Sequence, residues 1–127
     1  MDDIEEGDDG LARLNRKPFS GVAYEVADGE RPESELTFQK GLVHGLATDY
    51  YPDGRIKLQT EYRFGYRHGL GKEWYDNGIL ASESKFEFDV LVERRCWDNL
   101  GAVTSHFTLT PGDPQYRILE MFRRNRT

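Results

Sequence analysis

Acidic side chains recur at a fixed spacing along the chain, and these are the residues whose positions suggest chemistry. Glu25, Asp49 and Glu73 are successively 24 residues apart, and Tyr51 and Tyr75 each follow a member of this series by two residues. Carboxylates pair with cations, and tyrosine adds contact area and a hydroxyl at little cost in side-chain entropy. Such a row could therefore bind a cationic protein surface.

A second series has the same spacing and consists of Glu35, Gln59 and Glu83. Like charges on adjacent strands repel each other, so a row of carboxylates needs solvent, interleaved cations or a cationic partner. Two interpretations remain open: a solvated polar face and a partner-binding surface. On the second interpretation the candidate residues are Glu25, Asp49, Glu73, Tyr51, Tyr75, Glu35 and Glu83.

The remaining reactive residue types do not form a catalytic or metal-binding group. His44 and His68 occupy equivalent positions before a glycine, His106 is isolated, and Cys96 is the only cysteine. The serines lack the context of a nucleophile elbow, and the glycines lack the spacing of a phosphate-binding loop. We therefore expect no enzymatic activity, no metal and no cofactor.

Composition narrows the choice of partner. The chain has 127 residues, a length that suits one domain, and its formal net charge is -6. An acidic chain is a poor candidate for binding nucleic acid or an anionic membrane, whereas solubility or a cationic protein partner would fit. The lone cysteine, the lack of a signal pattern and the lack of a long apolar run favour a cytoplasmic protein.

The elements that position these residues follow from an internal repeat. Gly41-Leu42-Val43-His44-Gly45-Leu46 recurs as Gly65-Tyr66-Arg67-His68-Gly69-Leu70, and Tyr51-Pro52-Asp53-Gly54 recurs as Tyr75-Asp76-Asn77-Gly78. Self-similarity at a fixed period marks a repeat architecture in which each unit stacks on its neighbours. Such proteins usually present an extended surface to a partner.

Each repeat is predicted to be a β-hairpin. Strands over 46–51 and 55–64 flank Asp53-Gly54, and strands over 69–75 and 79–88 flank Asn77-Gly78. These dipeptides favour turns in which both central residues have φ above zero. A weaker copy over 21–40 contains Asp28-Gly29, and a degenerate copy runs from about 91 to 109. Its spacing slips by one, because Trp74 and Trp97 are 23 residues apart.

The two ends of the chain differ from the repeats. Residues 1–17 are acidic and rich in glycine, so we expect a disordered tail before a single domain over 18–127. Asp113 and Pro114 suit the N-cap and first position of a helix over about 113–124. This helix is expected to cover the last sheet edge, although its basic end, with Arg123, Arg124 and Arg126, could instead bind a partner.

Alternation along the strands divides the side chains between two faces. In the first strands, Val22, Leu46 and Leu70 share one face, opposite the acidic series that begins at Glu25. We expect the bulky residues of the return strands on the apolar face and Glu35, Gln59 and Glu83 on the acidic one. The two acidic series would then share a shallow trough that is floored by Gly and Ala and rimmed by Tyr51 and Tyr75.

The Gly-x-x-His-Gly turn, the strand ending in paired aromatics and the following Asp-Gly or Asn-Gly resemble the MORN-repeat variant family. The resemblance is clear over 41–78, moderate over 19–40 and poor after Phe88, where Asp89-Val90-Leu91-Val92 replaces the glycine-histidine turn. It implies an all-β fold of tandem 24-residue hairpins in a curved antiparallel meander sheet, followed by the short C-terminal helix.

Similar bacterial chains include YwqK-type antitoxin or immunity proteins, so the resemblance also implies a function. A protein of this type would bind and neutralise a cognate toxin by occlusion. The negative net charge of the chain would suit a toxin with a cationic cleft that acts on nucleic acid. The alternative is a structural or scaffolding repeat protein that mediates contacts between proteins.

Overall fold

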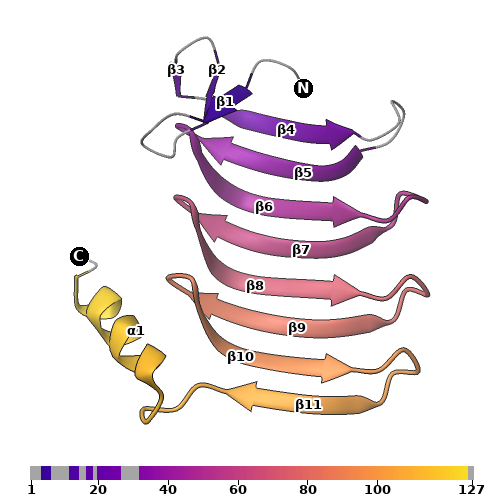
Figure 1. Cartoon of the computed structure of the whole chain (residues 1–127), viewed down its shortest axis with the longest axis vertical. Coiled ribbons are helices and arrows are strands. Elements are labelled where there is room, and N and C mark those ends of the chain that lie inside the picture. Colours follow the sequence, from indigo (N-terminus) through magenta and orange to yellow (C-terminus); the bar gives the residue numbers. More distant parts are fainter. Residues whose placement is uncertain (1–3, 7–11, 15–16, 19, 27–31, 126–127) are drawn as a thin grey trace.

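The chain forms an open antiparallel sheet of tandem hairpins. The computed structural model describes residues 4–6, 12–14, 17–18, 20–26 and 32–125. Eight strands follow one another in chain order, as Figure 1 shows, which confirms the predicted meander. The strands are β4 (Gly21–Val26), β5 (Pro32–Gln39), β6 (Leu42–Tyr50), β7 (Ile56–Arg63), β8 (Tyr66–Trp74), β9 (Leu80–Glu87), β10 (Val90–Trp97) and β11 (Val103–Thr108).

The N-terminal segment contains short strands in place of the uniformly unstructured tail expected from composition. β1 (Ile4–Glu6), β2 (Ala12–Leu14) and β3 (Lys17–Pro18) form a three-stranded sheet in that order. The extent of a disordered tail stays a prediction, because residues 1–3, 7–11 and 15–16 lie outside the described residues. The predicted Asp28-Gly29 turn also lies outside them.

The turns within the predicted hairpins use only one residue with positive φ. Gly54 and Gly78 have φ of 91° and 87°, and each donates its N–H to the carbonyl three residues earlier. Neither Asp53 nor Asn77 has a positive φ, so the prediction that both central residues of each turn have φ above zero was wrong. The glycine instead follows a tight turn, a geometry common in longer hairpin loops.

Turns with two positive φ values join successive hairpins instead. They are Lys40-Gly41 (51° and 86°), Phe64-Gly65 (44° and 91°) and Phe88-Asp89 (48° and 68°). We call these three the linking turns. Such turns match the right-handed twist of the flanking strands, which is why they suit short connections between adjacent strands.

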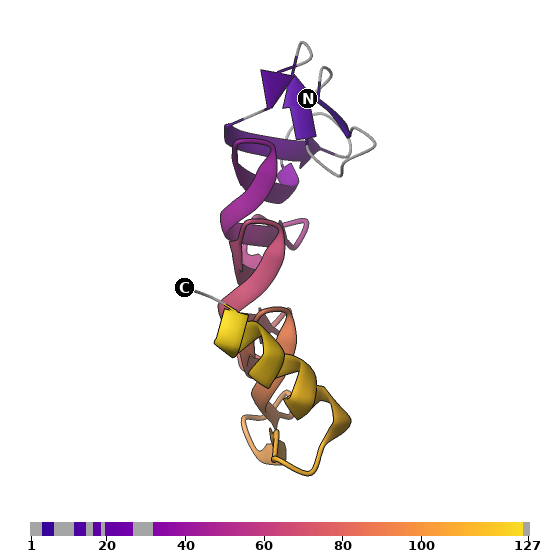
Figure 2. The ribbon, with the colours of Figure 1, turned by 90° about the vertical axis from the view of Figure 1, so that its left-hand side faces the viewer.

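The C-terminal helix α1 (Pro114–Asn125) begins as predicted but does not cover the last strand. All six residues of β11 are exposed. α1 lies beside the ends of the strands, close to the linking turn between β9 and β10 (Figures 1 and 2). There Leu119 is 1% exposed, and Phe122 stacks on Phe88 with ring centroids 5.4 Å apart. The apolar side of the helix therefore packs on the turn, and the expected edge protection was wrong.

Strand register corrects the predicted assignment of faces. Residues directly opposite each other on neighbouring antiparallel strands share a face. Leu36 lies opposite Ala23 and Ala47, and Phe86 lies opposite Gly69. The bulky residues of the return strands therefore share the face of the small residues, where each large side chain fills the space above a glycine or alanine.

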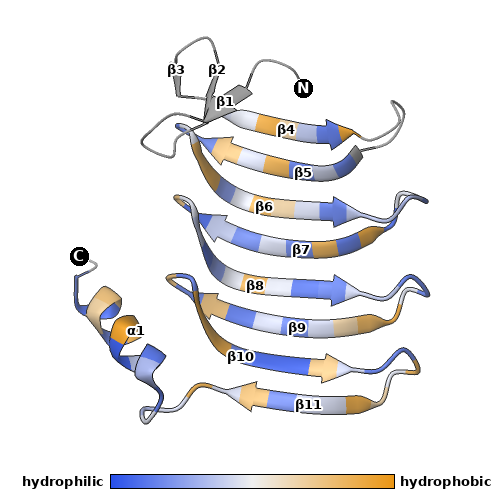
Figure 3. Cartoon of the chain, viewed as in Figure 1, coloured by the Kyte–Doolittle hydropathy of each residue, from blue (hydrophilic) through white to orange (hydrophobic). Residues whose placement is uncertain are grey.

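The face that carries Val22, Leu46 and Leu70 remains open, since these side chains are 43–45% exposed. The sheet is a single layer with alternating polar and apolar residues (Figure 3). Among the described residues, the buried apolar side chains are Ala23, Phe86, Val90 and Leu119. No described helix combines the length and apolar character that a membrane crossing requires.

Candidate binding trough

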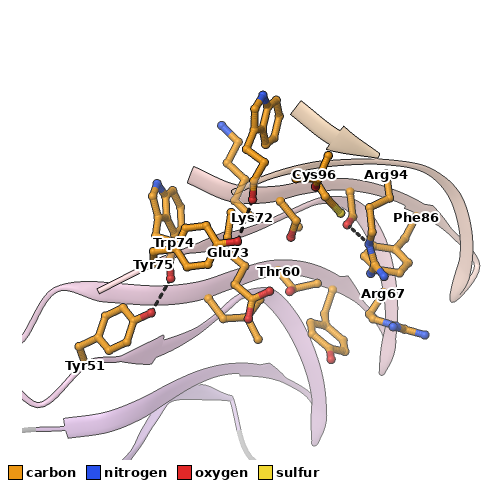
Figure 4. Close-up of a pocket in the computed structure, with 18 residues that line it drawn as sticks. Tyr51, Thr60, Arg67, Lys72, Glu73, Trp74, Tyr75, Phe86, Arg94 and Cys96 are labelled. Carbon is orange, nitrogen blue, oxygen red and sulfur yellow. Dashed lines mark hydrogen bonds between the residues drawn. The ribbon is translucent and has the colours of Figure 1, made fainter. Parts of the chain in front are cut away.

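A groove of about 560 Å³ crosses the sheet on the face of the small residues. Figure 4 shows its lining side chains, which come mainly from β7 to β10. We call this groove the trough. Its floor and walls include Leu58, Thr60, Tyr62, Gly71, Glu73, Ser82, Ser84, Phe86, Arg94 and Cys96, and Tyr51 and Tyr75 lie at one side.

The floor of the trough is shaped by Gly71 and Phe86. A Cβ atom added at Gly71 would lie 3.2 Å from Cε2 of Phe86. This separation is tighter than ordinary van der Waals contact, so a side chain at Gly71 would push the ring of Phe86 aside. Because Phe86 is only 5% exposed, the glycine preserves both the depth of the trough and the one aromatic ring that is buried among the described residues.

The first acidic series lies together on this face, as predicted. Glu25 pairs with Ser34, which pairs with Asp49, and Asp49 then connects through Leu58 to Glu73. Glu73 lines the trough, while Asp49 and Glu25 extend the row along the sheet beyond it. Asp49 and Glu73 are exposed and form no salt bridge with any described residue.

Tyr51 and Tyr75 border the trough and also connect neighbouring hairpins. The hydroxyl of Tyr51 donates to the carbonyl of Trp74 at 2.5 Å, and that of Tyr75 donates to the carbonyl of Trp97 at 2.8 Å (Figure 4 shows the first bond). Burial, followed by the nearby carboxylates of Asp76 and Glu73, raises the pKa of Tyr51. The phenol of Tyr51 therefore remains a donor near neutral pH, and the two hydrogen bonds hold both rings in place.

The second acidic series lies on the opposite face, so the prediction of a shared face was wrong. Glu35 is opposite Tyr24 and Thr48, and its carboxylate accepts a hydrogen bond from Tyr50 at 2.9 Å. Glu83 is opposite Lys72 and lies 3.8 Å from its ammonium nitrogen. Sequence alternation placed each series correctly within its own strand, but it did not reveal how the two strands of a hairpin face each other.

Two arginines in the trough were not among the predicted site residues. The guanidinium of Arg67 lies 4.4 Å from the ring centroid of Phe86, and its Nε donates to Asp89 Oδ1 at 2.6 Å. Although burial acts to raise the pKa of Asp89, the hydrogen bonds from Arg67 hold it below its usual value. Arg94 donates to Ser84 Oγ at 2.8 Å and forms no salt bridge with any described residue.

The one-residue slip in the last hairpin explains the position of Arg94. A register shift between Leu91 and Glu93 reverses the facing of the residues that follow. Ser84 consequently has Arg94 of β10 on one side and Gly71 of β8 on the other. Ser82 in the same way lies between Cys96 and Glu73. The 23-residue spacing of Trp74 and Trp97 was the sequence signal from which this exchange could have been found.

The histidines of the repeats have a structural role here. Nδ1 of His44 accepts the backbone N–H of Phe64 at 3.2 Å, and Nδ1 of His68 accepts that of Phe88 at 3.1 Å. No group of three or more His, Cys, Asp or Glu residues within the described part of the chain could hold a metal ion.

Comparison with known families supports the repeat assignment. Residues 43–63 and 67–87 each match the MORN repeat variant, and these segments contain β7 and β9 together with all but the first residue of β6 and β8. No curated protein matches the chain. MORN repeats suggest a module for protein–protein interaction, which agrees with an open trough and an extended sheet. The two central hairpins are therefore the part of the chain that is similar to the MORN repeat variant.

Proposed function

We propose that the protein binds a cationic segment of a partner protein in the trough and acts without catalytic turnover of its own. The observation that carries the proposal is the row of Glu25, Asp49 and Glu73 on one open face, where Asp49 and Glu73 have no salt-bridge partner among the described residues. A cationic partner would offset the mutual repulsion of these charges.

The trough also defines how such a segment would lie. Lysine or arginine side chains would contact Asp49 and Glu73, and an apolar side chain would pack against Leu58, which lines the trough between them. Arg94, at the far end of the row, would favour a carbonyl or carboxylate group of the partner. This arrangement selects a segment with cationic residues at one end and an acceptor at the other.

The finer proposal is that the partner is a toxin and the protein is its immunity protein. It rests on the resemblance to antitoxins of the repeat family and on the acidic row, which would speed association with a cationic toxin cleft. Occupation of that cleft would block access to a nucleic acid substrate. A scaffolding protein would use the same face to hold a partner without inhibiting it, so inhibition is the property that separates the two functions.

The experiment compares charge reversals on the two faces. Partners are captured by pull-down with the full chain and identified by mass spectrometry, and a captured toxin candidate is then co-expressed with the chain. Growth rescue is measured together with association rates of the purified pair at low and high salt. Asp49→Lys with Glu73→Lys should slow association at least tenfold at low salt and abolish rescue. Glu35→Lys with Glu83→Lys is the matched control on the opposite face and should change association less than twofold.

Deletion of residues 1–10 tests the competing acidic segment. If this deletion abolishes binding while the trough variant behaves as wild type, the trough is only a solvated face. Binding that depends on the trough but leaves the partner's activity intact would support the scaffolding function and exclude the immunity function.

A further inference from the structure

The three linking turns share one backbone device but present different side chains. In each turn, the N–H of the first residue is accepted by a side chain 20 residues earlier: Ser20 Oγ for Lys40 at 2.8 Å, His44 Nδ1 for Phe64 and His68 Nδ1 for Phe88. All three residues have positive φ. Because Lys40 satisfies the same geometry as the two phenylalanines, the turn itself does not require an aromatic ring.

The turn at Phe88 is the docking site of α1. The ring of Phe88 stacks on Phe122 with an interplanar angle of 11°, and Tyr66 and His68 pack around it at centroid distances of 5.7 and 5.0 Å. Beside this stack, Glu87 accepts hydrogen bonds from Arg123 Nε at 3.1 Å and Nη2 at 2.5 Å. An aromatic residue and the charged residue after it thus attach the helix to the turn.

The preceding turn presents the same aromatic feature without a helix. Phe64 is 53% exposed, and its ring contact among the described residues is with His44, at 4.6 Å between centroids. Figures 1 and 2 show that α1 lies beside the lower strands and leaves the turn between β7 and β8 uncovered. A large exposed aromatic residue with positive φ is uncommon. The geometry of the turn does not require this ring, because Lys40 has the same geometry in the first linking turn.

The residue that precedes the uncovered turn has the opposite charge to the one that precedes the turn bound by α1. Arg63 occupies the repeat position of Glu87, is exposed and forms no salt bridge with any described residue. A second copy of α1 would place Arg123 against Arg63, and the two guanidinium groups would repel each other. The complementary ligand therefore carries a carboxylate where α1 carries Arg123.

The space beside α1 suits a second helix. Equivalent turns are two strand spacings apart, roughly 10 Å, and packed helices have axes about 8–10 Å apart. Ile118 and Met121 are one helical turn apart on α1 and are 47% and 56% exposed.

We propose that the Phe64 turn is a docking site for an amphipathic helix of a partner protein in which an aromatic residue is followed by an acidic residue. The aromatic ring stacks on Phe64 as Phe122 stacks on Phe88, and the carboxylate pairs with Arg63. This site lies at the ends of the strands and is separate from the trough, so it does not depend on the function proposed above.

The test uses the chain's own helix as the probe. A fluorescent peptide of residues 110–125 with Arg123→Glu is titrated with the full chain, and binding is followed by fluorescence anisotropy beside the unchanged peptide. We expect the altered peptide to bind at least tenfold more tightly than the unchanged one. Phe64→Lys, which introduces the residue type found at position 40 of the first linking turn, should weaken binding of the altered peptide at least tenfold without loss of the circular dichroism spectrum.

Arg63→Glu provides a second variant that does not depend on the aromatic residue, and it should reverse the preference between the two peptides. Asp49→Lys with Glu73→Lys, in the acidic row on the face of the sheet, should leave peptide binding unchanged. Absence of binding to the wild type, equal binding of the two peptides, or binding that is insensitive to Phe64→Lys would overturn the proposal. So would a dimer of the full chain that dissociates on Phe64→Lys, since the turn would then serve a second copy.

Discussion

The third hairpin and the last hairpin have the same backbone topology but line the trough differently. In β8 and β9, Glu73, Gly71 and Phe86 supply a carboxylate, a glycine in the floor and a buried ring. In β10, the corresponding face presents Cys96 and Arg94. The shift of one residue in register places Arg94 and Cys96 on this face instead of Arg95 and Trp97, which follow Gly71 and Glu73 by 24 residues, and the order of strands is unchanged.

This difference limits the acidic surface to the first three hairpins of the sheet. The row that begins at Glu25 ends at Glu73, and Arg94 marks its end with the opposite charge. The irregular hairpin thus gives the trough a polarity, and a bound segment would have one favoured direction along it.

The largest predicted effect concerns a turn of the regular hairpins. Gly78 has a φ of 87°, which strains a β-branched side chain. Gly78→Val should lower the free energy of unfolding by about 1–3 kcal/mol. Lys57→Val, at an exposed strand position, should change it by less than about 0.5 kcal/mol. Both are measured by urea denaturation, and equal midpoints would contradict the assigned role of this turn.

The next prediction concerns the contact that joins the last hairpin to the third. Tyr75 donates its hydroxyl proton to the carbonyl of Trp97. Tyr75→Phe removes this donor and leaves the ring, so it should lower the free energy of unfolding by about 0.5–1.5 kcal/mol. Amide hydrogen exchange should accelerate in β10 and β11 more than in β6 and β7. Uniform acceleration over all strands would mean that the last hairpin does not open separately.

Much of the sheet could be predicted because the repeat contains its own turn signals. Gly54 and Gly78 mark the hairpin turns, and alternation within single strands placed Glu25, Asp49 and Glu73 on one face. The linking turns carry weaker signals. Phe64 and Phe88 have positive φ although phenylalanine disfavours it, because backbone geometry and the histidine acceptors outweigh side-chain preference at these positions.

The facing of the two strands within a hairpin could not be predicted from alternation alone. It depends on register shifts such as those between Glu25 and Val26 and between Glu73 and Trp74, where one strand gains a residue relative to its partner. One extra residue exchanges the faces of all that follow, so Glu35 and Glu83 moved to the other side. The docking of α1 was equally hidden, because Phe122 and Phe88 are 34 residues apart and nothing local pairs them.

A smaller effect is expected at the linking turn that carries α1. His68 accepts the N–H of Phe88 through Nδ1. His68→Ala should lower the free energy of unfolding by about 1 kcal/mol, whereas His68→Asn, whose amide oxygen can replace Nδ1, should cost less. Thermal melts of the two variants check this. If Asn costs as much as Ala, the ring contacts of His68 with Phe88 and Tyr66 matter more than the hydrogen bond.

The smallest effect concerns the pH dependence of the same turn. Asp89 has a lowered pKa because hydrogen bonds from Arg67 outweigh the opposing effect of burial. A carboxyl whose pKa is lower in the folded state stabilises the protein above its unfolded pKa of about 3.9, and this contribution is lost as pH falls through the folded value. Asp89→Asn keeps a residue that tolerates positive φ but removes the charge.

Wild type should therefore exceed Asp89→Asn in stability by a small, constant margin at neutral pH, and the margin should shrink as the pH falls below about 4. Denaturation midpoints at pH 7, 5 and 3 measure it. Because the Asp89 side chain is 55% exposed, added salt should reduce the margin at pH 7. A margin that grew on acidification would show that the carboxylate of Asp89 is not stabilised by Arg67, and Arg67 would then be free to bind a partner at the end of the trough.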